Sequence, residues 1–177
     1  MPAFTQASRL SLKNILFPTD FSDASQAALP YAQSLAKLYG STILVAHSIL
    51  AEPYQAIPMD RLPAQDNLAW QDARQKLEDF SKSRAFSAIS TKTLLDRGDV
   101  GKVVAEMIRE GNVDLVVLGT HGRRGVTKLI LGSAAEKINR SASCPVMTVG
   151  PKVRRPETGS CGEFFVRSTS ARIRYRS

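Results

Sequence analysis

Cysteine is scarce in this sequence, which contains only Cys144 and Cys161. Two cysteines form no disulfide framework, and neither belongs to a metal-binding motif. Neither has the His and Asn setting that would make it a nucleophile. We therefore expect no disulfide-stabilised domain, no metal bound by side chains of the protein and no catalytic thiol.

Long apolar runs are also missing. No run approaches the roughly 18 residues of a membrane span, and residues 1–11 lack the apolar stretch of a secretory signal. We therefore expect a cytoplasmic protein that does not enter a membrane, with a flexible leader at residues 1–12. A short organellar leader is the alternative, because Arg9 and several hydroxyl residues precede the first acidic residue, Asp20.

The two commonest nucleotide-binding motifs are absent as well. No Gly-Lys-Ser/Thr follows a glycine-rich turn, as it does in a Walker A loop, and no strand end carries G-x-G-x-x-G. The sequence shows no acidic Walker B partner and no residue that would orient an attacking water. We therefore name no catalytic residue and expect at most slow hydrolysis of a nucleotide.

Positive charge is concentrated at the end of the chain. The net charge is +8, but residues 152–177 contain seven basic and two acidic residues, a net of +5, which leaves +3 for residues 1–151. Because most of the positive charge lies in residues 152–177, the net charge of the chain says little about what the folded part binds. Residues 152–177 are predicted to be a basic, disordered tail after a domain at residues 13–151. Nucleic-acid binding is not expected of the domain and stays open for the tail.

What the sequence does have is a buried strand that ends in glycine. Residues 113–118 are apolar and β-branched, Gly119 follows them, and a helix-forming run opens at Gly132 and Ser133. In such a turn, backbone N–H groups and the positive end of a helix dipole converge on one point, which favours a phosphate. The alternative is that the glycines only turn the chain.

Alternation of strands and helices predicts the fold class. The predicted strands are residues 13–17, 42–49, 89–95, 113–118 and 145–149, and the predicted helices are one that ends at Gly40, residues 68–86, residues 100–110 and one from Gly132. Helix-length crossovers give a parallel sheet with helices on both faces. The proline-rich residues 50–66 are a long crossover and a candidate lid. Ligands of such sheets bind beyond the carboxyl ends of the strands, where residues 18–20, 47–48 and 119–133 are expected to meet.

Four separate motifs resemble the universal stress protein (UspA-like) family. They are ILFPTDFS at 15–22, LVAHS at 44–48, GTHG at 119–122 with GS at 132–133, and ASCPV at 142–146. The resemblance covers about residues 13–150. It implies an α/β, Rossmann-like fold of the adenine nucleotide alpha hydrolase-like type, with a five-stranded parallel sheet of strand order 3-2-1-4-5. It also implies a homodimer joined along the last strand, at Val146, Met147, Thr148 and Val149.

The same resemblance implies a nucleotide site. The ATP-binding subgroup of the family has the pattern G-x2-G-x9-G-(S/T), which this sequence fulfils with Gly119, Gly122, Gly132 and Ser133. The residues that it assigns to ATP are Pro18, Thr19, Asp20, Ser48, Leu118, Gly119, His121, Gly122, Arg123, Gly132, Ser133, Ala134 and Ala135.

Adenosine would lie at the ends of the first two strands. By the resemblance, Pro18, Thr19 and Asp20 would line it, and the Asp20 carboxylate would accept from the ribose hydroxyls or adenine. The backbone of Ser48 would pair with the adenine edge, where the family more often has Val, and Leu118 would close the pocket.

The phosphates would lie beyond the fourth strand. Their donors would be the N–H groups of Gly122, Gly132, Ser133 and Ala134, with the Ser133 hydroxyl as one more. Arg123 would contact the terminal phosphates, and Ala135 stands where many binders have Thr. Mg²⁺ would be held through the phosphates.

Several of these polar residues have a structural alternative. Asp20 can be a neighbour of a helix N-cap instead of a ligand. His121 has no partner carboxylate in the sequence, so a structural or solvated loop histidine is the alternative to a base. Arg123 can belong to a solvated loop face, and His47, inside an apolar strand, is expected to be a core histidine with satisfied hydrogen bonds.

The function that these patterns predict is binding of ATP or another adenine nucleotide by a ligand-controlled stress-response or regulatory module. Two alternatives remain open. One is a slow nucleotide hydrolase on the same scaffold, and the other is a nucleotide-free interaction protein in which the tail docks to a partner. The sequence does not distinguish ATP from AMP or cyclic AMP.

Overall fold

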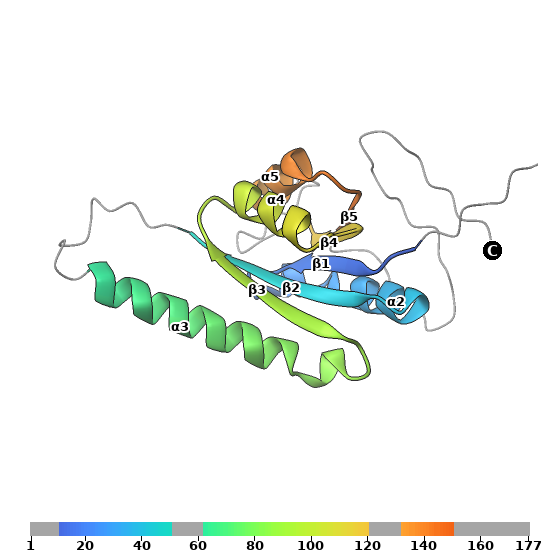
Figure 1. Cartoon of the computed structure of the whole chain (residues 1–177), viewed down its shortest axis with the longest axis horizontal. Helices are drawn as coiled ribbons and strands as arrows, with labels where there is room; N and C mark the ends of the chain where they lie inside the picture. Colours follow the sequence, from blue (N-terminus) through green and yellow to red (C-terminus); the bar gives the residue numbers. More distant parts are fainter. Residues whose placement is uncertain (1–10, 51–61, 121–131, 151–177) are drawn as a thin grey trace, which may run out of the picture.

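A five-stranded parallel sheet forms the centre of the molecule (Figure 1). The computed structural model describes residues 11–50, 62–120 and 132–150. The strands are β1 (Asn14–Pro18), β2 (Thr42–Ile49), β3 (Thr91–Arg97), β4 (Leu115–Gly119) and β5 (Val146–Val149). They lie in the order β3-β2-β1-β4-β5, which confirms the predicted fold class and strand order.

Helices cover both faces of this sheet. They are α1 (Asp23–Gln26), α2 (Leu29–Tyr39), α3 (Leu62–Ser81), the 3₁₀ helix η2 (Arg84–Phe86), α4 (Val100–Glu110) and α5 (Ser133–Ser141). Figure 1 shows α4 and α5 together on one side of the sheet and α3 on the other.

Alternation along each strand divides the apolar residues between two cores. Ile15 and Phe17 of β1 pack with α2, η2 and the Leu77 side chain of α3, and we call this side of the sheet the first core. Leu16, between them, packs with α4 and α5 in the second core. The same alternation runs through β2, β4 and β5. Continuous apolar runs are therefore needed, because each central strand is buried on both faces.

The helix expected to end at Gly40 is two helices. α1 ends at Gln26 and α2 begins at Leu29. In one unbroken helix, residue 30 would donate to the carbonyl of Gln26, but it is a proline and has no N–H. The break at Ala27 and Ala28 is therefore a consequence of Pro30, which occupies the first turn of α2.

The helix predicted from residue 68 begins at Leu62 and ends at Ser81, and residues 84–86 form the separate η2. The prolines of this region led the sequence prediction to place its start too late. Pro63 lies in the first turn of α3, where a missing N–H removes no intrahelical bond.

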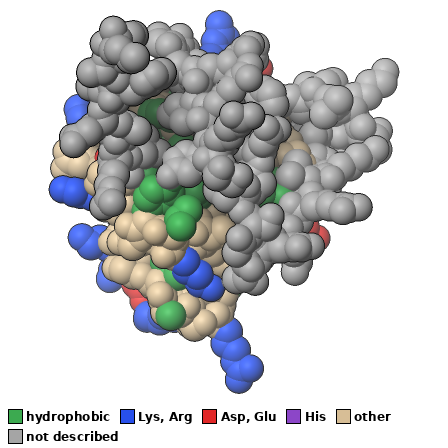
Figure 2. Space-filling view, turned by 90° about the vertical axis from the view of Figure 1, so that its right-hand side faces the viewer, with side chains coloured by type: hydrophobic (Ala, Val, Ile, Leu, Met, Phe, Trp, Pro, Cys, Tyr) green, Lys and Arg blue, Asp and Glu red, His purple; other side chains and the backbone are tan. Residues whose placement is uncertain are grey.

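Two features of the described residues concern binding to nucleic acid and to membranes. On the side of the molecule in Figure 2, the visible Lys and Arg side chains of the described residues stand apart from one another and form no continuous stripe. Within residues 11–50, 62–120 and 132–150, no helix is long and apolar enough to cross a membrane.

Candidate functional site

The ends of β1, β2 and β4 and the start of α5 lie at one edge of the sheet. β1 lies between β2 and β4, and the chain continues from β1 to the first-core side and from β4 to the second-core side. Ligands bind at such a switch point in parallel α/β sheets. The Gly132 amide donates to the Thr120 carbonyl at 2.7 Å, which places the start of α5 beside the end of β4.

Three of the predicted residues face the second core, where α5 lies. Leu118 belongs to that core itself. Pro18 and Ser48 each follow a second-core residue of the same strand, Leu16 and Ala46, by two positions, and residues two apart on a strand share a face. The structure therefore brings Pro18, Ser48 and Leu118 to the same side of the sheet edge as the first turn of α5.

The first turn of α5 presents amide groups. Its N-cap, Gly132, has φ −59° and ψ 151° and supplies no side-chain hydrogen bond. The amides of Ser133, Ala134 and Ala135 have no acceptor within the part of the chain that the structure describes. Ser133 and Ala134 are exposed, whereas the Ala135 side chain is buried in the second core. The first turn can therefore bind an anion through its backbone.

Gly132 itself was expected to offer its amide to a phosphate. The structure gives that amide to the carbonyl of Thr120 instead. Gly132 therefore fixes where α5 begins, and the amides that remain for a ligand are those of Ser133 and the residues after it.

Gly119 has a packing reason to be glycine. A Cβ atom there would lie 2.2 Å from the carbonyl oxygen of Ala24 and 3.2 Å from the Cα of Ser25. Both atoms belong to the backbone of α1, which cannot move aside as a flexible side chain does. This glycine lets α1 pack directly on the end of β4, whether or not a ligand binds there.

Thr19 has partners within the protein for all its polar groups. Its amide donates to the Ala46 carbonyl (2.8 Å), and its buried hydroxyl contacts the Ser25 hydroxyl (3.0 Å) and accepts from the Phe21 amide (3.0 Å). Its carbonyl accepts from the His47 ring (2.7 Å). The family resemblance placed Thr19 against adenosine, and in the structure its polar groups hold the turn after β1.

His47 lies on the face of the sheet opposite to Ser48. Its Nδ1 is 2.7 Å from the Thr19 carbonyl oxygen, and its ring centroid is 4.8 Å from that of Phe21. A carbonyl oxygen only accepts, so Nδ1 carries the proton in this contact. The expected hydrogen bond of His47 is present at one ring nitrogen, Nδ1, and the ring is half-buried and not enclosed in the core.

Asp20 is part of the turn that starts α1. Its Oδ1 accepts from both the amide (3.0 Å) and the hydroxyl (2.6 Å) of Ser22, which is the N-cap of α1. Partial burial would raise the pKa of the Asp20 carboxyl. Hydrogen bonds from Ser22 and Ser25 outweigh that effect and hold its pKa below the usual 3.8. Asp20 is therefore a neighbour of the α1 N-cap, and its carboxylate is ionised at neutral pH.

We expect Asp20→Asn to lower the free energy of unfolding at pH 7 by about 1 kcal/mol or less, because solvent screens a half-exposed carboxylate. The folded-state pKa lies below the unfolded one. The stabilisation is therefore present above the unfolded pKa and is lost as the pH falls through the folded pKa. Urea unfolding at pH 7 and at about pH 2 measures this. A difference between the two proteins that is as large at low pH as at pH 7 would rule out the carboxylate as its cause.

Two contacts near the candidate site were not predicted from the sequence. The Ser48 hydroxyl donates to the Gly98 carbonyl at 3.1 Å, and Asp99 forms an ion pair with Lys137 on α5. An N-cap role for Asp99 is visible in the sequence, because an acidic residue precedes a helix. Its contact with Lys137 joins positions that are distant along the chain, and no local pattern marks it.

Cys144 is half-buried beside β4. Burial, and to a lesser degree the charge of Asp114, raise the pKa of its thiol to about 11. The thiol is therefore protonated at neutral pH.

Other predicted features lie outside the described residues. They are His121, Gly122 and Arg123 of the site, most of the leader and of the candidate lid, and the tail at residues 152–177. Within residues 11–50, 62–120 and 132–150, no three His, Cys, Asp or Glu side chains form a group that could hold a metal ion.

Known proteins share both the sequence pattern and the fold. Residues 11–150 match the sequence model of the universal stress protein family. Universal stress protein A homolog 1 of Coxiella burnetii is 33% identical over 143 residues, which are 79% of this chain and 97% of the relative.

Among solved structures, protein MJ0577 of Methanocaldococcus jannaschii superposes with a TM-score of 0.69 at 23% identity, over 82% of this chain and all of the other. A universal stress protein in complex with cAMP superposes with a TM-score of 0.52 at 19% identity, over 80% of this chain and 98% of the other. These similarities show the same α/β, Rossmann-like fold.

Proposed function

The chain belongs to the universal stress protein family, and on this basis we propose that it binds an adenine nucleotide at the edge of the sheet between β1 and β4. The observation that carries the proposal is geometric. Pro18, Ser48 and Leu118 share one sheet face with the first turn of α5, at the switch point of the strand order.

The two ends of this edge suit the two ends of a nucleotide. Apolar Leu118 and Pro18 and the backbone of Ser48 can contact a flat base. The amides of Ser133, Ala134 and Ala135, at the positive end of α5, can bind phosphate. Mg²⁺ would be held through the phosphates and few protein groups. Ala135 has no hydroxyl to add, so the backbone and Ser133 supply the phosphate contacts in this proposal.

The identity of the nucleotide is part of the proposal. The G-x2-G-x9-G-S pattern favours ATP, whereas a protein of similar fold has been solved with cAMP. A triphosphate gives the α5 amides more anionic oxygens to bind than a cyclic monophosphate does. We therefore propose ATP as the preferred ligand.

We further propose that the protein is a binding module in a stress response and not a catalyst. Asp20 is engaged with Ser22, and His47 lies on the opposite face of the sheet from Ser48. Neither is set up to orient a water against a bound phosphate. Binding alone can shift the protein between two conformations if the ligand prefers one of them.

Equilibrium binding of ATP, AMP and cAMP to the full-length protein, followed by calorimetry, tests the proposal. We expect ATP to bind most tightly. Mass spectrometry of small molecules that co-purify with the native protein identifies a ligand without assuming one. Absence of any adenine nucleotide binding at millimolar concentration would show a nucleotide-free interaction protein. Steady ADP release that is proportional to protein concentration would show a hydrolase.

We also propose that the protein is a homodimer joined along β5. The Val149 carbonyl accepts from Thr120 and the Pro145 carbonyl from Val116, so these residues turn their polar groups to β4. In a parallel ladder, alternate residues of a strand hydrogen-bond to the same neighbouring strand. The backbone N–H and C=O groups of Val146 and Thr148 therefore point away from β4, toward the open edge of the sheet. The side chains of Val146, Met147 and Val149 are buried already. The edge therefore offers mainly backbone hydrogen bonds to a second copy.

Thr148→Pro removes one outward N–H without removing a bond to β4. We expect the wild type to elute as a dimer in size exclusion with light scattering. The dimer dissociation constant of the variant should be at least about tenfold higher than that of the wild type. Circular dichroism serves as the control for folding. A monomeric wild type, or a folded variant that dimerises equally well, contradicts the β5 interface.

A further inference from the structure

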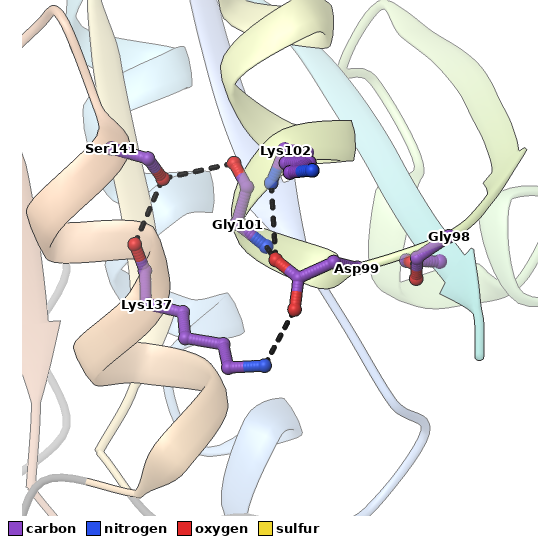
Figure 3. Close-up of polar contacts among 7 residues, drawn as sticks. Gly98, Asp99, Gly101, Lys102, Lys137 and Ser141 are labelled. Carbon is purple, nitrogen blue, oxygen red and sulfur yellow. Dashed lines mark hydrogen bonds and ion pairs between the residues drawn. The ribbon is translucent and has the colours of Figure 1, made fainter. Parts of the chain in front are cut away.

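Helix α5 is attached to α4 at two points (Figure 3). The Lys137 ammonium lies 2.5 Å from Asp99 Oδ2, and the Ser141 hydroxyl donates to the Gly101 carbonyl at 2.9 Å. Lys137 follows Ser133 by four residues, one helical turn, so the first attachment lies directly behind the turn proposed to bind phosphate. We call Asp99, Gly101, Lys137 and Ser141 the α4–α5 brace.

Asp99 contacts both helices at once. Its Oδ1 accepts from the amides of Gly101 (3.0 Å) and Lys102 (3.4 Å), as the N-cap of α4, while Oδ2 binds Lys137. The bond from Lys137 is the largest cause of the lowered pKa of Asp99. The ionised Asp99 carboxylate therefore accepts hydrogen bonds from two amides at the start of α4 and also forms an ion pair with α5.

The two helices are also packed closely here. A Cβ atom on Gly101 would lie 3.2 Å from Asp99 Oδ1, 3.3 Å from the Cβ of Lys137 and 3.3 Å from the Ser141 hydroxyl. Glycine at this position therefore lets α4 and α5 approach closely enough to form the contacts of the α4–α5 brace.

The residue before Asp99 reaches the other end of the proposed site. Gly98, with φ +142°, accepts from the Ser48 hydroxyl at 3.1 Å and donates its amide to the Ile49 carbonyl at 2.9 Å. Gly98 thus contacts the end of β2, where the base would lie. Asp99, the next residue, contacts α5, where the phosphates would lie.

We propose that the turn at Gly98–Asp99 sets the spacing between the two halves of the nucleotide site, and that Asp99 and Lys137 are positioning residues that contact no ligand. This inference rests on the proposed nucleotide binding. It implies that loss of the Asp99–Lys137 pair weakens binding of the phosphates, while binding of adenosine, held at the other end, changes little.

Asp99→Asn separates this role from a simple charge effect. Asparagine caps a helix as well as aspartate does, so α4 keeps its N-cap. The substitution makes the sheet edge more positive and frees Lys137, and simple electrostatics therefore predicts tighter ATP binding. The brace predicts weaker binding, because α5 loses one of its two polar attachments to α4. The two explanations differ in sign.

Calorimetric binding of ATP and adenosine to full-length variants tests the proposal. Because both side chains are partly exposed, we expect Asp99→Asn and Lys137→Met each to weaken ATP binding about two- to fivefold, with less than about twofold change for adenosine. The double variant should be little worse than either single one, because both remove the same contact. Lys137→Arg should restore most of the affinity. Lys102→Met is the matched control, because it removes a neighbouring positive charge that forms no ion pair within the described residues.

Amide exchange in the ligand-free protein gives a second measurement. The brace predicts faster exchange at Ser133–Ile138 in Asp99→Asn than in the wild type, with no change for Lys102→Met. ATP affinity that is equal or higher in Asp99→Asn would overturn the positioning role. If the wild type binds no nucleotide, the proposed function fails, and the brace is then decided by exchange alone, where unchanged rates in Asp99→Asn would overturn it.

Discussion

Replacing Gly119 by alanine is expected to lower the free energy of unfolding by about 3 kcal/mol or more, or to prevent folding altogether. The added Cβ would lie 2.2 Å from the carbonyl oxygen of Ala24. No rotamer change relieves this contact, because the opposing atom belongs to the backbone. Helix α1 would have to move away from β4, and the turn that holds Thr19 and Asp20 would move with it.

Gly40→Ala is the matched control. Gly40 ends α2 with φ +68°, and a Cβ there would have no atom within 4 Å. Its substitution costs only the backbone strain of a left-handed residue, about 1–2 kcal/mol. Urea unfolding followed by circular dichroism compares the two variants. If Gly119→Ala is no less stable than Gly40→Ala, the close approach of α1 to β4 is wrong.

Ser133→Pro is expected to weaken ATP binding about 10- to 100-fold while leaving the fold intact. Proline removes the Ser133 amide, which is one hydrogen-bond donor to a charged phosphate and is worth about 1.5–3 kcal/mol. Ser133 is the first residue of α5, where proline is well tolerated. Gly132 before it is extended, with φ −59° and ψ 151°, and this is the conformation that a following proline requires.

Ser133→Ala separates the hydroxyl from the amide, because it removes only the former. We expect a loss of affinity of less than about tenfold for this variant. Thermal unfolding of the free proteins should show wild-type stability for both. Equal losses for the two variants would mean that the hydroxyl acts and the amide does not. No loss in either would remove the start of α5 from the nucleotide site.

The elements that the sequence predicted best have strong local signals. β2 has the predicted limits, because a continuous apolar run specifies it. α4 also has the predicted limits, because an N-cap residue precedes it and a glycine follows it. Boundaries failed at prolines. A proline in a first turn and a proline that breaks a helix look alike until the surrounding chain is placed, as Pro63 and Pro30 show.

The candidate site was predicted as a set of positions but not as a set of contacts. The parallel topology places residues 18–20, 48 and 118–119 at one edge, and topology follows from element order. The roles of single residues depend on contacts distant in the sequence. Gly119 faces α1, Gly132 donates to Thr120, and Asp99 binds Lys137. None of these pairings leaves a periodic pattern.

The hydrogen bond from Gly132 to Thr120 has a consequence for how α5 is anchored. It joins the residue after β4 to the N-cap of α5, so the first turn of α5 is tied to the end of β4 by a contact between two described residues. We therefore expect a movement of β4 to carry the amides at the start of α5 along with the sheet.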